Sequence, residues 1–459
     1  MLVVLVGAVA VIGANTALDR WTAGRPPVLR RAARLAVPVL LMGAILTVAS
    51  FRAPAPEVRA SRGPTLNEAG AIPHRLAWTA ETARRFVETT QLPATNPIVT
   101  GALRPKAPTG TVERATPANR RDVVEVFYGT DRTRADKAKR IAYGIDRAQR
   151  LELGRAVVTI PTAYQAPSSA QQWSIKRSYF GVSLRDKAQD TRTHFTVSQI
   201  GTLTRDEMLE LVAERLRMSK DYKDHALVFV HGYNNDFDHA LYRTAQIAYD
   251  LKFDGASFMY SWPSGGSFTA YTYDRDSARQ TMRYLSDFID LAVMESGATR
   301  VSVIAHGMGS QPLLSVLSDL RREAPGAPRI HQLILAAPDI DRDAFEIVAE
   351  QIKGISNGIT LYASSSDLAL GVSRRFGGDI ARAGDVGESG PAIVPGIDSI
   401  DISTLNTAFF AMNHATYAEQ SALIQDIERL LLTGARPPDR RLPILKRVTG
   451  PAGVYWRYP

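Results

Sequence analysis

The 459-residue chain contains no cysteine. This absence excludes a disulfide framework, thiolate metal ligands and a cysteine nucleophile, so any covalent chemistry must use another nucleophile, such as serine. No glycine-rich phosphate-binding motif stands at a strand-to-helix junction, and no histidine has a second ligand at metal-binding spacing. We therefore expect no cofactor and no metal. With 45% hydrophobic and 22% charged residues, the composition is that of a globular protein.

Acidic residues are too few to balance the basic ones, and the chain carries a net charge of +9. The imbalance is confined to residues 1–120, which hold 15 basic and 6 acidic residues, whereas the remainder holds 40 of each. A folded region without a net positive field does not attract phosphates over long range. The charge distribution therefore argues against nucleic acid as a partner.

Charge is also absent from two hydrophobic stretches near the N-terminus, Met1–Leu18 and Leu35–Phe51. Each is close to the shortest length that spans a bilayer as a helix. The loop between them has five arginines and one acidic residue, and basic loops stay cytoplasmic. We expect residues 1–51 to form a transmembrane hairpin that anchors the chain, with everything after Arg52 on the exported side, periplasmic or extracellular. The alternatives are that the second stretch is a cleaved signal peptide, or that the protein is soluble and its start misassigned.

Residues 52–120 hold nine of the 26 prolines and little hydrophobic periodicity, which predicts a linker. From residue 121 to 435, apolar segments of strand length alternate with helical patterns, and 436–459 form a C-terminal tail. This order predicts an α/β domain with a mostly parallel sheet, helices on both faces, and an antiparallel or mixed start. Strands are expected at 123–128, 156–160, 194–200, 226–230, 256–260, 300–305, 332–336, 359–363 and 399–402, and helices at 206–218, 237–251, 274–295, 309–322, 343–353 and 416–432.

Two glycine-containing turns follow strands of the expected parallel sheet. After strand 226–230 comes His231-Gly232-Tyr233, where glycine permits a sharp turn that directs a backbone N–H, such as that of Tyr233, into the crevice as an oxyanion donor. After strand 300–305 comes His306-Gly307-Met308, with small residues on either side. Small flanking residues at a strand-to-helix turn are typical of a nucleophile elbow, and the Met308 N–H would be the second donor. The central position, where a serine is expected, holds Gly307.

Further polar residues follow later strands. Ser364–Asp367 comes after strand 359–363, and His414 comes after the last strand, so the chain order is elbow, acid, histidine, as in the triad of alpha/beta hydrolases. Asp339 and Asp341 are either an alternative acid or caps of the following helix. We expect four residues to line the cleft: His231, Gly232, His306 and Trp262.

The region from about Val123 to Leu432 resembles the alpha/beta-hydrolase family of unknown function DUF900, of the esterase/lipase superfamily. Six motifs carry the resemblance: LVFVHGYNN (Leu227–Asn235), FMYSWPSGGS (Phe258–Ser267), DRDSAR (Asp274–Arg279), VIAHGMG (Val303–Gly309), LILAAPDID (Leu333–Asp341) and LYASSSDLAL (Leu361–Leu370). The resemblance implies an alpha/beta-hydrolase fold and an elbow of the form A-H-S-M-G. It places Gly307 at the position of the nucleophile, Asp367 as the acid and His414 as the base.

These features predict a membrane-tethered protein of esterase/lipase type, acting on an acyl ester or a lipid-like small molecule. Its inherited chemistry would be hydrolysis of carboxylic esters, impaired because glycine has no atom with which to attack a carbonyl carbon. The alternative is a non-catalytic envelope protein that binds an acyl ligand or a protein partner in the former cleft. A third possibility is a hydrolase in which Asp367 and His414 activate a water molecule directly.

Overall fold

The computed structural model describes most of the chain after residue 121: residues 122–135, 140–161, 194–267, 270–323, 325–326, 329–365, 370, 373, 380–405 and 417–459. The expected membrane segments, the linker, Asp367 and His414 lie outside these ranges. Among the described helices, none is both long enough and apolar enough to cross a membrane.

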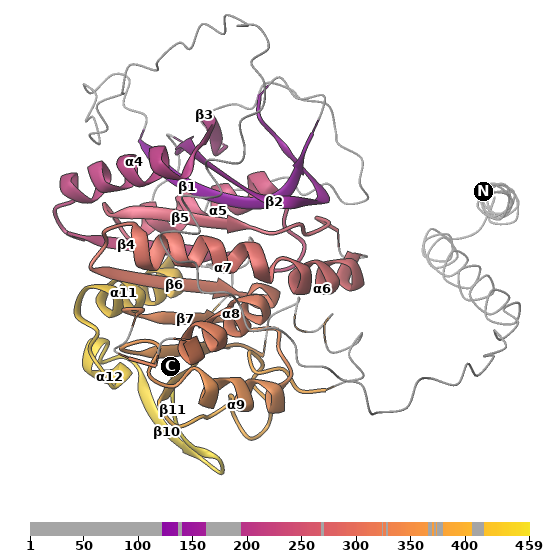
Figure 1. Ribbon diagram of the computed structural model, residues 1–459. Helices are drawn as coiled ribbons and strands as arrows, with labels where there is room; N and C mark the ends of the chain where they lie inside the picture. The colour runs from indigo at the N-terminus through magenta and orange to yellow at the C-terminus, as the bar shows by residue number, and fades with distance from the viewer. Residues whose placement is uncertain are drawn as a thin grey trace, which may run out of the picture. The chain divides into compact units, whose positions relative to one another are not determined.

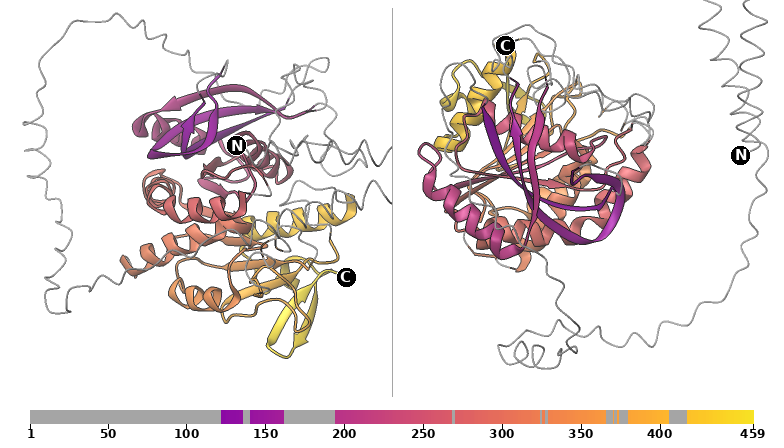
Figure 2. Two further views of the ribbon diagram at one scale, coloured as in Figure 1. Left: turned by 90° about the vertical axis from the view of Figure 1, so that its right-hand side faces the viewer. Right: turned by 90° about the horizontal axis from the view of Figure 1, so that it is seen from above.

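The described strands form one mostly parallel sheet of eleven, in the order β10-β11-β9-β8-β7-β6-β4-β5-β1-β2-β3 (Figure 1). In this order, every pairing between β11 and β1 is parallel. At the two ends of the sheet, β10 pairs antiparallel with β11, and β2 pairs antiparallel with both β1 and β3. The left view of Figure 2 shows the first three strands at one end of the sheet and the yellow C-terminal hairpin at the other. The strands are β1 (Val123–Arg134), β2 (Tyr143–Thr159), β3 (Thr196–Leu203), β4 (His225–Val230), β5 (Ala256–Ser261), β6 (Arg300–His306), β7 (Leu333–Ala336), β8 (Ile359–Ala363), β9 (Ile397–Asp401), β10 (Lys446–Gly450) and β11 (Gly453–Arg457).

Some of the helices begin where a side chain satisfies one of the first backbone N–H groups. Thr204 and Glu207 form a capping box at the first helix, and Asp236 caps the second. The helices are α4 (Arg205–Met218), α5 (Phe237–Asp250), α6 (Tyr271–Gln280), α7 (Met282–Asp290), α8 (Ser310–Glu323), α9 (Arg342–Gln351), α11 (Tyr417–Thr433) and α12 (Pro438–Arg441). The helix expected over 274–295 is therefore two helices, and a π-helical turn, Leu291–Glu295, follows the second.

The sheet has a hydrophobic core on each face, because successive strand residues point to opposite sides. In β4, Val228 and Val230 belong to the core under α4, α7, α8 and α9, whereas Leu227 and Phe229 belong to the core under α5 and α11. All six residues of β4 and all six of β5 are buried. The expected parallel sheet with helices on both faces is confirmed.

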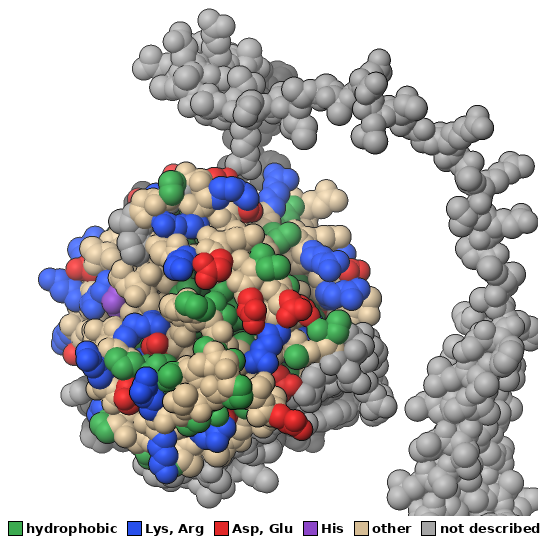
Figure 3. Space-filling model, turned by 90° about the horizontal axis from the view of Figure 1, so that it is seen from below, with side chains coloured by type: hydrophobic (Ala, Val, Ile, Leu, Met, Phe, Trp, Pro, Cys, Tyr) green, Lys and Arg blue, Asp and Glu red, His purple; other side chains and the backbone are tan. Residues whose placement is uncertain are grey.

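The segment after residue 435 continues the sheet. Short helix α12 leads into the hairpin of β10 and β11, and β11 pairs in parallel with β9. Positive and negative side chains are interspersed on the face at this end of the molecule (Figure 3). This mixture is expected, because the chain after residue 120 holds equal numbers of basic and acidic residues. The sequence pattern had indicated only a tail here, because each strand of this hairpin is five residues long.

Candidate active site

The turn between β6 and α8 has the backbone geometry of a nucleophile elbow. The strand ends at His306, a single 3-10 turn covers Gly307–Gly309, and α8 begins at the next residue. Gly307 has φ +53°, a left-handed conformation that costs most other residues about 1–2 kcal/mol. A Cβ built on Gly307 would have Gly232 Cα, at 3.8 Å, as its nearest non-adjacent neighbour. A small side chain therefore fits in the space at Gly307, and the only cost is backbone strain.

The elbow lies against the loop that follows β4, because glycines allow the two segments to approach. A Cβ on Gly232 would lie 2.8 Å from His306 Nδ1 and 2.9 Å from His306 O, and one on Gly309 would collide with His231 O. Small residues are thus required where the sequence predicted them. The register of the adjacent strands, Val230 opposite Ala305, brings the loop and the elbow to the same edge of the sheet.

Tyr233 and Met308, whose N–H groups we predicted as oxyanion donors, are both buried, at 7% and 0% exposure. Each lies three residues beyond the last paired residue of its strand, Val230 in β4 and Ala305 in β6. The Tyr233 ring packs edge-on against Tyr271 of α6, with the centroids 5.5 Å apart. The structure therefore places the two residues on adjoining turns at the carboxyl edge of the sheet, where sites of such folds lie.

His231 and Trp262, both expected to line the cleft, lie beneath the loop. Trp262 is fully buried, its ring stacks on His231 with 5.0 Å between centroids, and its Nε1 donates to His231 O at 2.8 Å. Burial, together with the nearby positive charge of Arg132, lowers the pKa of His231 to about 3. His231 is therefore neutral at physiological pH, and the two rings support the loop.

Asp274 of α6 joins two loops of the site through one buried carboxylate. It accepts hydrogen bonds from Asn234 N at 3.0 Å, from Ser264 Oγ at 2.6 Å and from Gly265 N at 2.6 Å. Burial raises the pKa of this carboxyl, and the three donors partly offset that effect. The loop after β4 is thereby fastened to the loop after β5.

Arg132, at the carboxyl end of β1, fastens the same loops through their carbonyl groups. Its guanidinium donates to Asn235 O at 2.8 Å, to Ser264 O at 3.0 Å and to Ser261 Oγ at 3.0 Å. The side chain is 2% exposed, and burial lowers its pKa to about 10, so it stays charged at neutral pH. Neither Arg132 nor Asp274 was given a role from the sequence, although Asp274 opens the DRDSAR motif.

Asp339 and Asp341, which follow β7, have different roles. Asp341 caps α9 by accepting from Ala344 N at 3.0 Å, as one of the two sequence interpretations expected. Asp339 does not cap this helix. Its backbone N donates to Gly307 O at 3.0 Å, and its buried carboxylate accepts from Tyr271 at 3.1 Å and from Ser373. Asp339 thus ties the elbow to the end of β7.

No serine among the described residues occupies the position of the missing nucleophile. Ser310 is fully buried at the start of α8, and Ser315, one turn further on, donates to Gln311 O at 3.2 Å. The N–H of Ser364 donates to Gly384 O at 2.9 Å at the end of β8. Asp367 and His414 lie outside the described residues, but β8 and β9 run parallel and end side by side, with Ala363 opposite Asp401.

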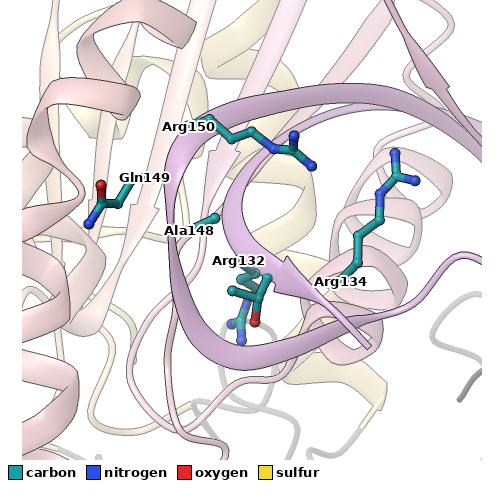
Figure 4. A pocket seen from close by; sticks show the side chains of 6 residues that line it. Arg132, Arg134, Ala148, Gln149 and Arg150 are labelled. Atoms are coloured by element: carbon teal, nitrogen blue, oxygen red, sulfur yellow. The ribbon is translucent and has the colours of Figure 1, made fainter. Parts of the chain in front are cut away.

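A separate cavity of about 310 Å³ lies in the curve of the β1–β2 hairpin (Figure 4). Arg134 and Arg150 extend into this space, and both bind Glu152, at 2.9 Å and 3.2 Å. Gln149 points away from it. The guanidinium groups are thus partly neutralised, and the cavity belongs to the β1–β2 end of the sheet and not to the turn after β6. Its lining residues are Arg132, Thr133, Arg134, Ala148, Gln149 and Arg150.

Residues 205–434, half of the chain, match the family described as an alpha/beta hydrolase of unknown function, DUF900. The chain belongs to this family. No curated protein matches the sequence. The matched region of this DUF900 protein begins at α4 and ends just after α11, so it contains the elbow and the loop after β4, whereas β1 to β3 and the C-terminal hairpin lie outside it.

Within this DUF900 domain the structure brings together five of the predicted site residues. They lie on the two adjoining turns that follow β4 and β6, and they are His231, Gly232, Tyr233, His306 and Gly307. Arg132 escaped the sequence interpretation because it is separated by about 100 residues from the loop that it binds. The available signal was the pair of charged residues Asp131 and Arg132, a few positions beyond the strand expected over 123–128.

Proposed function

We propose that this DUF900 protein is a carboxylic ester hydrolase of the esterase/lipase type by ancestry, and that its activity is impaired because Gly307 replaces the nucleophile. The observation that carries the proposal is the conformation of Gly307. Its φ of +53° and the open space around its missing Cβ are the geometry in which an elbow presents a nucleophilic side chain.

In the complete form of such a site, a histidine accepts the proton of the serine hydroxyl, and the serine oxygen attacks the acyl carbonyl carbon. The N–H groups of Tyr233 and Met308 stabilise the negative charge on the carbonyl oxygen. We assign the acid to Asp367 and the base to His414. Loss of the nucleophile from a comparable triad lowers turnover by a factor on the order of 10⁶, while the oxyanion donors and substrate binding retain about 10³ to 10⁴ over water.

The decisive experiment restores the nucleophile. We expect the full-length Gly307→Ser chain to hydrolyse p-nitrophenyl esters at least on the order of 10²-fold faster than the native chain and to react with a fluorophosphonate probe. The matched control is Gly307→Ala, which introduces the same Cβ and the same backbone strain without the oxygen. The alanine chain is expected to gain neither signal.

Two results would contradict the proposal. If the serine chain folds but neither hydrolyses esters nor binds the probe, the cleft is not that of a serine esterase. If the native glycine chain already turns over esters at rates typical of enzymes, the activity is not impaired, and a water activated by His414 becomes the favoured nucleophile.

A second candidate function is non-catalytic binding of an acyl ligand in the same cleft, and the lack of a nucleophile at Gly307 favours it. Displacement of a fluorescent fatty acid from the native chain tests it. Binding by the native chain, together with an inactive Gly307→Ser chain, supports this second function over the first.

We further propose that the domain is tethered to a membrane by residues 1–51 and lies on the exported side. The support is the pair of uncharged stretches and the arginine-rich loop between them. A position next to a bilayer would suit acyl esters, which partition into lipid.

A further inference from the structure

Asn234 combines two unfavourable features within the loop after β4. The residue is 6% exposed, and its side-chain amide nitrogen, Nδ2, is buried without a hydrogen-bond partner among the residues that the structure describes. Its backbone is left-handed, with φ +60°. Buried donors are nearly always satisfied in folded proteins, and unfavourable local features persist mainly where function requires them.

The surrounding contacts hold Asn234 in this conformation. Asp274 accepts from its backbone N at 3.0 Å, and the next residue, Asn235, is held through its carbonyl by Arg132 at 2.8 Å. The side-chain nitrogen of Asn235 uses both of its N–H groups, because it donates to Gly232 O at 3.1 Å and to Tyr233 O at 3.0 Å. Two adjacent asparagines thus differ: the Asn235 amide stabilises the loop, whereas the Asn234 amide makes no bond within it.

The loop position of Asn234 suggests what its amide binds. Tyr233, the predicted oxyanion donor, immediately precedes it, and Gly232 Cα lies 3.8 Å from the point where a Cβ of residue 307 would stand. We propose that the Asn234 side-chain amide is a third hydrogen-bond donor of this site. It would donate to the acyl oxygen of the substrate, beside the N–H groups of Tyr233 and Met308. This inference rests on the proposed ester-hydrolase function.

The test compares full-length chains that all carry Gly307→Ser. Adding Asn234→Gly removes the amide and keeps the left-handed backbone at no steric cost. We expect kcat for p-nitrophenyl esters to fall about 10²-fold with KM changed less than about threefold, because a donor to the developing oxyanion acts mainly in the transition state. Asn234→Asp, which keeps the shape but replaces the donor with an acceptor, is expected to lose at least as much.

Thermal unfolding separates a donor from a merely structural residue. Since the Asn234 amide makes no bond in the loop, Asn234→Gly is expected to leave Tm unchanged or raise it. Asn235→Gly, the matched control, removes two bonds and is expected to lower Tm. A fall in kcat without a fall in Tm for Asn234→Gly supports the inference.

Two outcomes contradict it and are distinguishable. If Gly307→Ser is active and adding Asn234→Gly leaves kcat unchanged, or lowers it only in step with Tm, the inference on Asn234 fails and the proposed function stands. If Gly307→Ser itself is inactive, the proposed function fails, and the inference fails with it.

Discussion

At the scale of single residues, the carboxyl edge of the sheet contains ionisable side chains whose protonation is set by burial. Asp131, next to the site-forming Arg132, is 2% exposed and accepts from Tyr260 at 3.0 Å and from Thr281 at 2.9 Å. Burial raises its pKa to about 6, and the hydrogen bonds only partly oppose that rise. An unfolded aspartate titrates near pH 3.9, so Asp131 is more easily protonated in the folded chain.

This difference predicts a specific pH dependence of stability. A raised carboxyl pKa contributes stability that is complete below about pH 4 and is lost as the pH rises through about 6. Relative to Asp131→Asn, whose amide oxygen still accepts both bonds, we expect the native free energy of unfolding to fall by about 2–3 kcal/mol between pH 4 and pH 7. Urea unfolding of both chains, followed by tryptophan fluorescence, measures this. A difference that is the same at both pH values contradicts the prediction.

At the scale of elements, a buried ion pair attaches the C-terminal hairpin to the rest of the domain. Arg441, the last residue of α12, donates from Nε to Asp426 of α11 at 2.7 Å, and both side chains are 0% exposed. The Tyr362 hydroxyl of β8 donates to the second carboxylate oxygen of Asp426 at 2.6 Å. The helix that leads into β10 and β11 is thereby connected to β8, an interior strand of the sheet.

Breaking this pair from one side should destabilise the domain strongly. Arg441→Met leaves the Asp426 charge buried without a cation, and we expect it to lower the free energy of unfolding by about 3–5 kcal/mol. Combining it with Asp426→Leu should restore most of the loss, because the Asp426 carboxylate is then removed together with its cation, while Asp398 keeps its pair with Arg436 at 3.0 Å. The control is Arg322→Met, in an ion pair with Asp319 whose side chains are 73% and 60% exposed, with an expected effect below about 1 kcal/mol. Equal effects of the buried and exposed substitutions in urea unfolding would contradict this interpretation.

At the scale of the whole molecule, charge divides the chain into two regions. The excess of nine positive charges lies in residues 1–120, with four of the nine in residues 1–51 and five in the segment 52–120, and the remainder is neutral overall. Such a distribution would orient the membrane anchor that we propose, and it does not give the folded domain an affinity for polyanions.

Topology can be tested directly. A reporter enzyme that is active only after export, fused to the C-terminus of the full-length chain, is expected to be active, and the fusion should fractionate with membranes. Deletion of residues 1–51 should abolish both signals. An active reporter with the protein released in a shortened form would favour the cleaved signal peptide, and an inactive reporter would contradict export.

The sequence determined the order of strands and helices from β4 to α11, because apolar runs and helical periodicity are local properties of the chain. It also located the elbow at Gly307 and the loop at His231–Tyr233, since small residues at strand ends are visible in the sequence. The break at Thr281 and the short hairpin of β10 and β11 were not visible, because their apolar patterns are weak and their stability comes from partners distant in the chain.

Only the tertiary structure decided which polar groups serve the site. Arg132, Asn235 and Asp274 are far apart in sequence, and pairing of β1 with β5 brings them to one edge, where their hydrogen bonds fix the loop after β4. The tertiary structure also gives different roles to Asp339 and Asp341, and to Asn234 and Asn235, although the two members of each pair are the same type of residue. The physical reason is that a side chain's role depends on burial and on the partners around it, and both are created when the strands come together.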